Sequence, residues 1–271
     1  MTPWQEVIGV VLLACAGAGA GYLLSRLPKA YWLLGYVPAL LLLVAVGISS
    51  LEAFPPFSWL MRYRRESASA AALIPVVFCT VLFQLRQKHA KILLVVLVVA
   101  ADFHFGVHSF LRPALFEKRH RRFQTIVTED GVCLQNMDYT CAPAAAVTAL
   151  RLLGLEAEEG ELAILARTVP GSGTNFGLLC KALEKRYGSE GLSCRQVDFT
   201  TIDDLKGAGV PIVSVRHYTG VGHSVVVMEV TDKEVVIGDP VAGLKRLSHR
   251  SFLGIWNMTG IVLTRDVPAH P

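Results

Sequence analysis

Four long apolar runs before residue 112 constrain the fold of this chain more than any other feature. Residues 7–24, 30–48 and 68–85 contain no charged residue, and residues 92–111 contain only one, Asp102. Each run approaches the length of about 20 residues with which an α-helix crosses a bilayer. One such run could be a buried helix of a soluble protein, but four in succession predict an all-α transmembrane region of about four helices.

The first run is predicted to be an uncleaved helix and not a signal peptide. No Lys or Arg precedes it, whereas a signal peptide begins with a basic segment. Gly17, Gly19 and Gly21 lie among small residues, which favours close packing against a neighbouring helix in lipid. We therefore expect an integral, multi-pass membrane protein.

The basic residues gather beside the apolar runs, as is typical of membrane-flanking charge. They are Arg26, Lys29, Arg62, Arg64, Arg65, Arg86, Lys88, Lys91, Arg112, Lys118, Arg119, Arg121 and Arg122. No nucleic-acid recognition motif accompanies them, so lipid and not nucleic acid is the expected partner of this charge. With four spans, more Lys and Arg lie on the side that holds the C-terminal half. This bias favours a cytoplasmic location for that half, and it reverses if one run does not span.

The rest of the chain has the composition of a water-soluble domain. Residues 112–124 are predicted to be a basic linker, residues 125–264 a domain of ordinary size, and residues 265–271 a tail. In the domain, helical segments come first and strands rich in Val and Ile follow. This order predicts an α+β fold in which N-terminal helices pack on a C-terminal antiparallel sheet.

Cys141 is the first candidate for chemistry in this domain. It follows the polar residues 135–140 and directly precedes an alanine-rich helical segment. A helix N-terminus favours the anionic form of a thiol because of the helix dipole. Gln135 can return to the same place as a neutral hydrogen-bond donor, and a thiolate beside such a donor suits acyl transfer.

His223 and Asp239 are candidates for the base and its orienting group. The strand-like segments 224–230 and 234–238 predict a hairpin that places His223 opposite Asp239 at its open end. A carboxylate beside a histidine can fix its tautomer and stabilise its cation. Two alternatives stay open. In the first, His223 is a plain turn residue. In the second, His217 is the base, although no carboxylate lies at a hairpin position that matches His217.

The remaining cysteines leave the compartment undecided. The chain has no C-x-x-C pair, which argues against a zinc site. A disulfide among Cys133, Cys180 and Cys194 stays open, and it requires that the domain face an oxidising space.

The fourth apolar run carries three ionisable residues, Asp102, His104 and His108. Ionisable groups in a membrane segment are candidates for function, and the spacing of the two histidines places them on one helix face. A metal or proton site is one interpretation. Anchoring at the interface or packing against another helix is the other.

Three motifs, in this order, resemble the double-glycine leader peptidases, the bacteriocin-processing cysteine peptidases of papain-like fold. The stretch from Gln135 to Ala146 looks like their active-site motif, with the same spacing from Gln135 to Cys141, and Asp138-Tyr139-Thr140-Cys141 is similar to stand-alone members. Residues 222–227 look like the histidine strand. The aspartate turn and the end of the domain are similar at Gly238, Asp239, Pro240, Gly243, Phe252 and Trp256. The resemblance covers about residues 125–264.

This resemblance implies a role for each site residue. Cys141 would be the nucleophile, His223 the general base and acid, and Asp239 its orienting group. Gln135 and the main-chain N–H of Cys141 would donate to the oxyanion. The implied reaction is peptide-bond hydrolysis through an acyl-enzyme, without metal or cofactor.

The resemblance also implies a substrate, a partner and a location. The substrate would be a peptide or small-protein precursor, cut after a small-residue pair such as Gly-Gly at the end of a leader. A separate ABC-type exporter would be the partner, and the bacterial inner membrane the location.

Two features depart from that family. The residue after the nucleophile is usually glycine, and here it is Ala142, whose methyl group either narrows the substrate groove or marks a degenerate site. The motif G-x-x-x-x-G-K-S/T, which marks the ATPase of full-length leader-peptidase transporters, does not occur in this sequence. Two alternatives therefore stay open: an inactive peptidase-like module that binds leader peptides for a partner transporter, and a cysteine acyltransferase.

Overall fold

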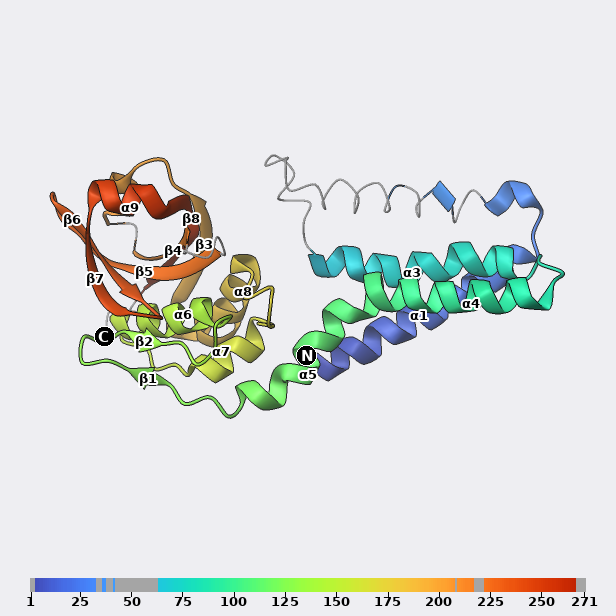
Figure 1. Cartoon of the computed structure of the whole chain (residues 1–271), viewed down its shortest axis with the longest axis horizontal. Helices are drawn as coiled ribbons and strands as arrows, with labels where there is room; N and C mark the ends of the chain where they lie inside the picture. Colours follow the sequence, from blue (N-terminus) through green and yellow to red (C-terminus); the bar gives the residue numbers. More distant parts are fainter. Residues whose placement is uncertain are drawn as a thin grey trace. The chain divides into compact units, whose positions relative to one another are not determined.

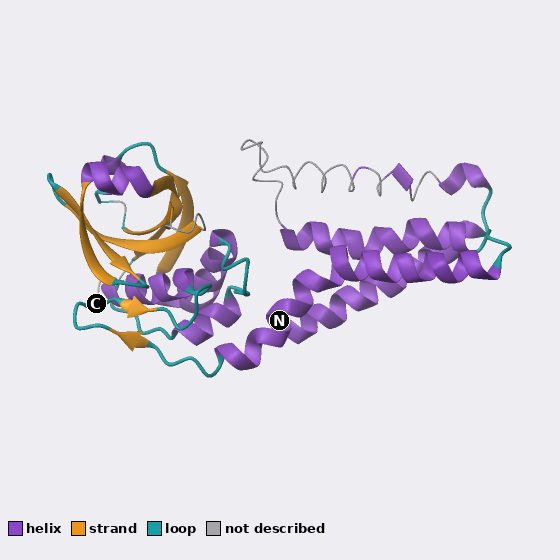
Figure 2. Ribbon diagram, in the orientation of Figure 1, coloured by secondary structure: helices purple, strands orange, loops and turns teal. Residues whose placement is uncertain are grey.

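The computed structural model describes residues 3–32, 36–37, 41, 63–207, 209–216 and 222–266. The chain divides into two compact units, Met1–Leu115 and Phe116–Pro271 (Figure 1). The described part of the first unit is helical, whereas the second combines helices with strands (Figure 2).

The helices of the first unit pack through glycine. Its described elements are α1 (Pro3–Ser25), η1 (Lys29–Trp32), α3 (Tyr63–Leu82), α4 (Lys88–Asp102), the π-helix η3 (Phe103–Val107) and α5 (His108–His120), whose end belongs to the second unit. A Cβ on Gly17 would overlap the carbonyl oxygen of Ala72, and one on Gly21 would overlap that of Val76. The backbones of α1 and α3 can approach this closely because both positions lack a side chain. Gly19 is different, since a Cβ there would meet no atom within 4 Å.

Two helices in the described part of the chain are long and apolar enough to cross a membrane. They are Pro3–Ser25 and the continuous helix Lys88–His120. The apolar part of α3, Ser67–Leu82, is shorter than a full span. Most of the predicted run 30–48 lies outside the described residues. Two of the four predicted runs therefore form helices of spanning length.

The second unit begins with short strands and three α-helices. They are β1 (Ile126–Val127), β2 (Cys133–Leu134), α6 (Cys141–Leu152), α7 (Glu159–Leu165), α8 (Phe176–Tyr187) and the short η4 (Gly188–Glu190). Alanine, which has the highest helix propensity, dominates α6, and residues 142–150 are all buried. Asn175 caps α8, because its side chain accepts hydrogen bonds from the N–H groups of Gly177 and Leu178.

A six-stranded antiparallel sheet forms the C-terminal half of this unit. Its strands are β3 (Leu192–Asp198), β4 (Val210–Arg216), β5 (Gly222–Val230), β6 (Glu234–Asp239), β7 (Gly243–Ser248) and β8 (Trp256–Arg265). Two further helices, η5 (Ile202–Leu205) and α9 (His249–Ile255), lie between strands in the sequence. The order across the sheet is β3-β8-β4-β5-β6-β7, with every pair antiparallel. The predicted α+β arrangement of helices and antiparallel sheet is confirmed.

The sheet separates two hydrophobic cores, because successive side chains of a strand point to opposite faces. Ile212 of β4 belongs to the core that contains Leu150 of α6. Its neighbour Val213 belongs to the core that contains Phe252 of α9. Figure 1 shows α6 and α9 on opposite sides of the sheet.

A disulfide joins α8 to the edge strand β3. It links Cys180 to Cys194, whose Cα atoms lie 5.3 Å apart, and it is one of the pairings that the sequence left open. Cys133 is a free cysteine and is fully buried.

Some elements differ from the sequence-based expectation. Residues 112–120, predicted as part of a linker, form the end of α5, where His120 is buried among residues of the second unit. This segment was interpreted as a linker because it contains many basic residues. The alanine-rich helix predicted to follow Cys141 begins at Cys141 itself, and β7, α9 and β8 were not predicted as elements.

Candidate active site

Cys141 is the first residue of α6. The loop before it is closed by Thr140, whose Oγ1 accepts a hydrogen bond from the N–H of Met137 at 3.2 Å and donates one to its carbonyl oxygen at 3.0 Å. The thiol is partly exposed, whereas the residues that follow it in the helix are buried. A twelve-residue helix therefore presents one partly accessible thiol at its N-terminus.

The surroundings of Cys141 favour its thiolate. Burial alone would raise the pKa of this thiol. A hydrogen bond with His223, the charge of that imidazole, and hydrogen bonds from the N–H and hydroxyl of Ser224 outweigh burial, so the pKa of Cys141 is lowered from its usual range. The structure thus brings Cys141 of α6 together with two consecutive residues of β5.

His223 is held on its other side by Asp239. Its Nε2 lies 2.8 Å from Asp239 Oδ1, and both side chains are at least nine-tenths buried. Because Nε2 faces the carboxylate, Nδ1 is the nitrogen left for Cys141. This is the arrangement in which an acidic group fixes the tautomer of a histidine and stabilises its cation.

The sequence predicted that His223 and Asp239 lie directly opposite each other on neighbouring strands. In the structure their contact is diagonal. Val226 pairs with Gly238, so Asp239 comes next on β6 beside Val225. The register shifts between Val227 and Glu229, where β5 carries a bulge that sequence periodicity does not reveal. Long side chains still reach a diagonal neighbour on the same face of a sheet, which explains the hydrogen bond.

Asp239 is itself fixed by two further donors. Its Oδ1 accepts the N–H of Val241 at 2.9 Å, and its Oδ2 accepts Nζ of Lys245 at 2.8 Å. Burial would raise the pKa of Asp239, but these bonds and the one from His223 hold it well below its usual range.

The pKa of His223 moves in the opposite direction. Burial would lower it, but the hydrogen bonds with Asp239 and Cys141 and the charges of these two groups raise it to about 9. The lowered pKa of Cys141 and the raised pKa of His223 both favour the thiolate–imidazolium form of the pair.

Gln135 is tied to the turn that carries Asp239. Its N–H donates to the carbonyl oxygen of Pro240 at 2.9 Å. Its side-chain Oε1 is buried and accepts no hydrogen bond within the described part of the chain. The loop before Cys141 and the turn after β6 are thus joined beside the site.

Sequence reasoning missed two residues of this constellation. Ser224 follows His223, where its small polar side chain was the available signal. Lys245 lies on β7, a strand that was not predicted, so its ion pair with Asp239 had no visible basis. His217, the rival base, lies outside the described residues.

Ala142, the residue after Cys141, is buried. It is 1% exposed and belongs to the hydrophobic core beneath α6. The methyl group of Ala142 is therefore packed inside the domain.

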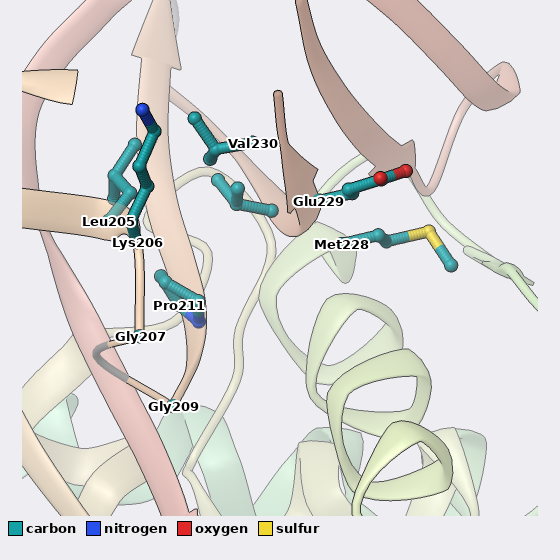
Figure 3. Close-up of a pocket in the computed structure, with 9 residues that line it drawn as sticks. Leu205, Lys206, Gly207, Gly209, Pro211, Met228, Glu229 and Val230 are labelled. Carbon is teal, nitrogen blue, oxygen red and sulfur yellow. The ribbon is translucent and has the colours of Figure 1, made fainter. Parts of the chain in front are cut away.

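The other polar candidates do not gather into a metal site. Within the described residues, no three His, Cys, Asp or Glu side chains come close enough to hold a metal ion. His104 and His108 stack with ring centroids 6.4 Å apart at the π-helix η3. A pocket of about 330 Å³ lies between η5, β4 and β5 (Figure 3), and neither Cys141 nor His223 lines it.

Known structures and proteins resemble the second unit. The peptidase domain of Streptococcus ComA, a bi-functional ABC transporter involved in quorum sensing, is 21% identical and covers 53% of this chain and 100% of its own, with a TM-score of 0.43. A double glycine motif protease from an AMS/PCAT transporter, solved with the leader peptide, is 18% identical and covers 53% of this chain and 93% of its own, also with a TM-score of 0.43.

Two curated proteins are more similar in sequence. An uncharacterised protein of Methanothermobacter marburgensis is 32% identical over 143 residues, which are 53% of this chain and 94% of that protein. A Pseudomonas fluorescens protein, described as the probable functional amyloid protease FapD, is 31% identical over 147 residues, which are 53% of this chain and 61% of that protein.

A family model covers the same half of the chain. The model of the peptidase C39 family matches residues 130–268. This match contains Gln135, Cys141, His223 and Asp239, and it confirms the resemblance predicted from the three motifs. The chain therefore belongs to the peptidase C39 family, and its second unit is a papain-like cysteine peptidase domain.

Proposed function

We propose that this protein is a membrane-anchored cysteine peptidase that cleaves a peptide or small-protein precursor through an acyl-enzyme on Cys141. The observation that carries the proposal is the chain of contacts from Cys141 to His223 to Asp239. The pKa of the thiol is lowered and that of the imidazole is raised, as an activated thiolate–imidazolium pair requires.

The mechanism follows from these positions. The thiolate of Cys141 attacks the carbonyl carbon of the scissile bond, and a C–S bond forms while the carbonyl electrons move to oxygen. Gln135 and the N–H of Cys141 donate hydrogen bonds to that oxyanion. The carbonyl then re-forms, the C–N bond breaks, and His223 gives its proton to the leaving amine.

Water completes the cycle. His223, now neutral, takes a proton from water as the water oxygen attacks the thioester carbon. The C–S bond breaks, the acid product leaves, and Cys141 returns to a thiolate beside the imidazolium. Asp239 stays ionised throughout, because it orients and stabilises His223 without taking its proton.

The substrate is proposed to carry a small-residue pair, such as Gly-Gly, at the end of a leader. The motifs around Cys141, His223 and Asp239 support this, since they resemble double-glycine leader peptidases. A separate ABC-type exporter is the proposed partner for transport. The FapD relative, described as a probable functional amyloid protease, adds functional amyloid proteins as a substrate class to test.

The two apolar helices Pro3–Ser25 and Lys88–His120 support a multi-pass membrane anchor. Two observations bear on the side of the membrane. The basic residues favour the cytoplasm for the peptidase domain, but that count depends on the run 30–48. The disulfide between Cys180 and Cys194 favours an oxidising space, since disulfides persist there and are rare in the cytosol. We propose the oxidising side, because the disulfide does not depend on the number of spans.

The test is cleavage by the full-length protein in detergent. Synthetic precursors with Gly-Gly or other residue pairs before a cargo peptide are incubated with the enzyme, and the products are identified by mass spectrometry. Cys141→Ala should abolish cleavage, whereas Cys15→Ala, at an exposed cysteine of α1, should leave it unchanged. Cleavage retained by Cys141→Ala would overturn the proposal. An added amine that captures the acyl group in place of water would show an acyltransferase instead.

A further inference from the structure

Glu159 is an acidic side chain that is fully buried in the peptidase domain. It is the first residue of α7, far from Cys141 in the sequence. Burying a carboxylate is unfavourable unless hydrogen bonds or opposite charges compensate for the lost water. A buried acid in this position therefore needs partners that account for it.

Those partners are both donors of one residue, Asn136. Its backbone N–H lies 2.9 Å from Glu159 Oε1 and 3.2 Å from Oε2. Its side-chain Nδ2 lies 2.5 Å from Oε2. Hydrogen bonds to a carboxylate are among the stronger ones in proteins. The Glu159 carboxylate therefore holds Asn136 through both its backbone N–H and its side-chain amide.

Asn136 directly follows Gln135, the proposed oxyanion donor. The loop is thus held at two consecutive residues from two different elements. The N–H of Gln135 donates to Pro240 beside β6, and that of Asn136 donates to Glu159 at the start of α7. Fixing both peptide groups restricts the Gln135 backbone, and with it the direction of the Cα–Cβ bond from which its side chain extends.

The backbone at Glu159 and Gly160 is itself held by neighbouring residues. Its own N–H donates to Thr125 Oγ1 at 3.0 Å. The next residue, Gly160, lies so close to the carbonyl oxygen of His120 that a Cβ there would overlap it. The start of α7 therefore packs closely between the end of α5 and the loop that precedes Cys141. This packing holds the backbone of Glu159 in place.

We propose that Glu159 is a positioning residue for the oxyanion hole: by holding both donors of Asn136, it places Gln135 to stabilise the tetrahedral intermediate. This inference rests on the proposed peptidase function. Glu159 acts through Asn136 and Gln135 and does not touch the substrate. A preorganised donor matters because it stabilises charge that develops only in the transition state.

The experiment is a double-mutant cycle on peptide cleavage by the full-length protein. Glu159→Gln keeps the size of the side chain but turns one acceptor into a donor that faces the donors of Asn136. We expect kcat to fall about tenfold or more with little change in KM, since a lost oxyanion donor costs roughly 100- to 1,000-fold in kcat. In a Gln135→Ala background the same substitution should have almost no further effect, because the group that it positions is gone.

Two further variants separate positioning from plain stability. Glu161→Gln, on the same helix, changes the same kind of group where it is exposed and paired with Arg186, and it should leave kcat unchanged. Asn136→Ala removes the side-chain half of the contact from the opposite partner and should lower kcat without Glu159 being altered. The rate at which iodoacetamide alkylates Cys141 should be the same in Glu159→Gln as in the wild type, because alkylation forms no oxyanion.

Each outcome decides the question. Effects of Glu159→Gln and Gln135→Ala that multiply independently would overturn the inference, as would a change in KM alone or slower alkylation of Cys141. A wild-type protein that cleaves none of the precursors would remove the peptidase proposal, and this inference with it.

Discussion

Lys245 Nζ lies 2.8 Å from Asp239 Oδ2, on the carboxylate oxygen that His223 does not use. The ammonium therefore helps to hold the orientation of the carboxylate. The side chain of Lys245 is 41% exposed, so solvent screens much of this ion pair. We expect Lys245→Met to lower kcat/KM only about twofold to fivefold, in line with the small energies of exposed pairs. Lys233→Met, in an exposed turn, is the matched control and should have no effect. A loss as large as that of Asp239→Asn would show that Lys245 has a role beyond orientation.

The pH dependence of cleavage should reflect the raised pKa of His223. The imidazolium is needed to protonate the leaving amine, and its pKa of about 9 means that activity declines as the pH rises through about 9. On the acidic side, activity should rise as Cys141 ionises, at a pH below that of an ordinary thiol because its pKa is lowered. A profile of kcat/KM between pH 5 and 10 measures both limbs.

Asp239→Asn should move the alkaline limb of that profile to lower pH. The substitution removes the carboxylate whose hydrogen bond and charge help to raise the pKa of His223. We expect kcat to fall roughly tenfold or more, because the imidazolium is also less well oriented. An alkaline limb that stays in place would mean that the carboxylate does not control the imidazole.

Iodoacetamide should distinguish Cys141 from Cys133. Burial, with the nearby charge of Glu159, raises the pKa of Cys133 to about 12, and this side chain is fully buried. Cys141 has a lowered pKa and is partly exposed. At pH 6 to 7 we expect Cys141 to be alkylated and Cys133 to stay unmodified, as read by peptide mass spectrometry. Equal labelling of the two would argue against an activated thiol.

Ala142→Gly should change stability and leave catalysis almost unaltered. The methyl group of Ala142 is buried under α6, so removing it costs packing and helix propensity, together about 1 kcal/mol of unfolding free energy. We expect kcat/KM to stay within about twofold, since the methyl group is buried in the hydrophobic core. A large rise in activity would instead support the interpretation of Ala142 as a mark of a degenerate site.

The disulfide between Cys180 and Cys194 should stabilise the peptidase domain. The two residues are 14 apart in sequence, and closing a loop of that size contributes about 3 kcal/mol. Replacing both cysteines with alanine should therefore lower the unfolding temperature, whereas Cys15→Ala should not.

A fusion to alkaline phosphatase tests the side of the membrane on which the peptidase domain lies. This enzyme is active only outside the cytoplasm, and it is fused after the last residue of the chain. An inactive fusion would place the domain in the cytoplasm.

The sequence indicated the constituents of the site, because each lies in a local pattern. Cys141 stands before an alanine-rich helix, and His223 and Asp239 lie near the ends of two strands with Val and Ile. The register between those strands was predicted incorrectly, because the turn lies further along the chain than its predicted centre near residue 231: Val230 pairs with Val235.

Residues whose role depends on distant contacts were not predictable. Glu159 stands at the start of a helix, where an acidic residue is ordinarily exposed and favourable to the helix dipole. Only the fold shows that it is buried against Asn136, 23 residues earlier in the sequence. Lys245 is only six residues from Asp239 in the sequence, and it was missed because its strand, β7, was not predicted.

The end of helix α5 decides where this peptidase domain can be separated from the apolar half. His120 is 1% exposed, and its ring centroid lies 6.0 Å from that of Tyr139, two residues before Cys141. The motifs alone would place the domain boundary at residue 125. A truncation that starts there removes the His120 ring, and the loop that carries Tyr139 loses that packing contact. Soluble versions should start before Phe116, since the last turn of a helix long enough to span a membrane is also part of the interior of the catalytic domain.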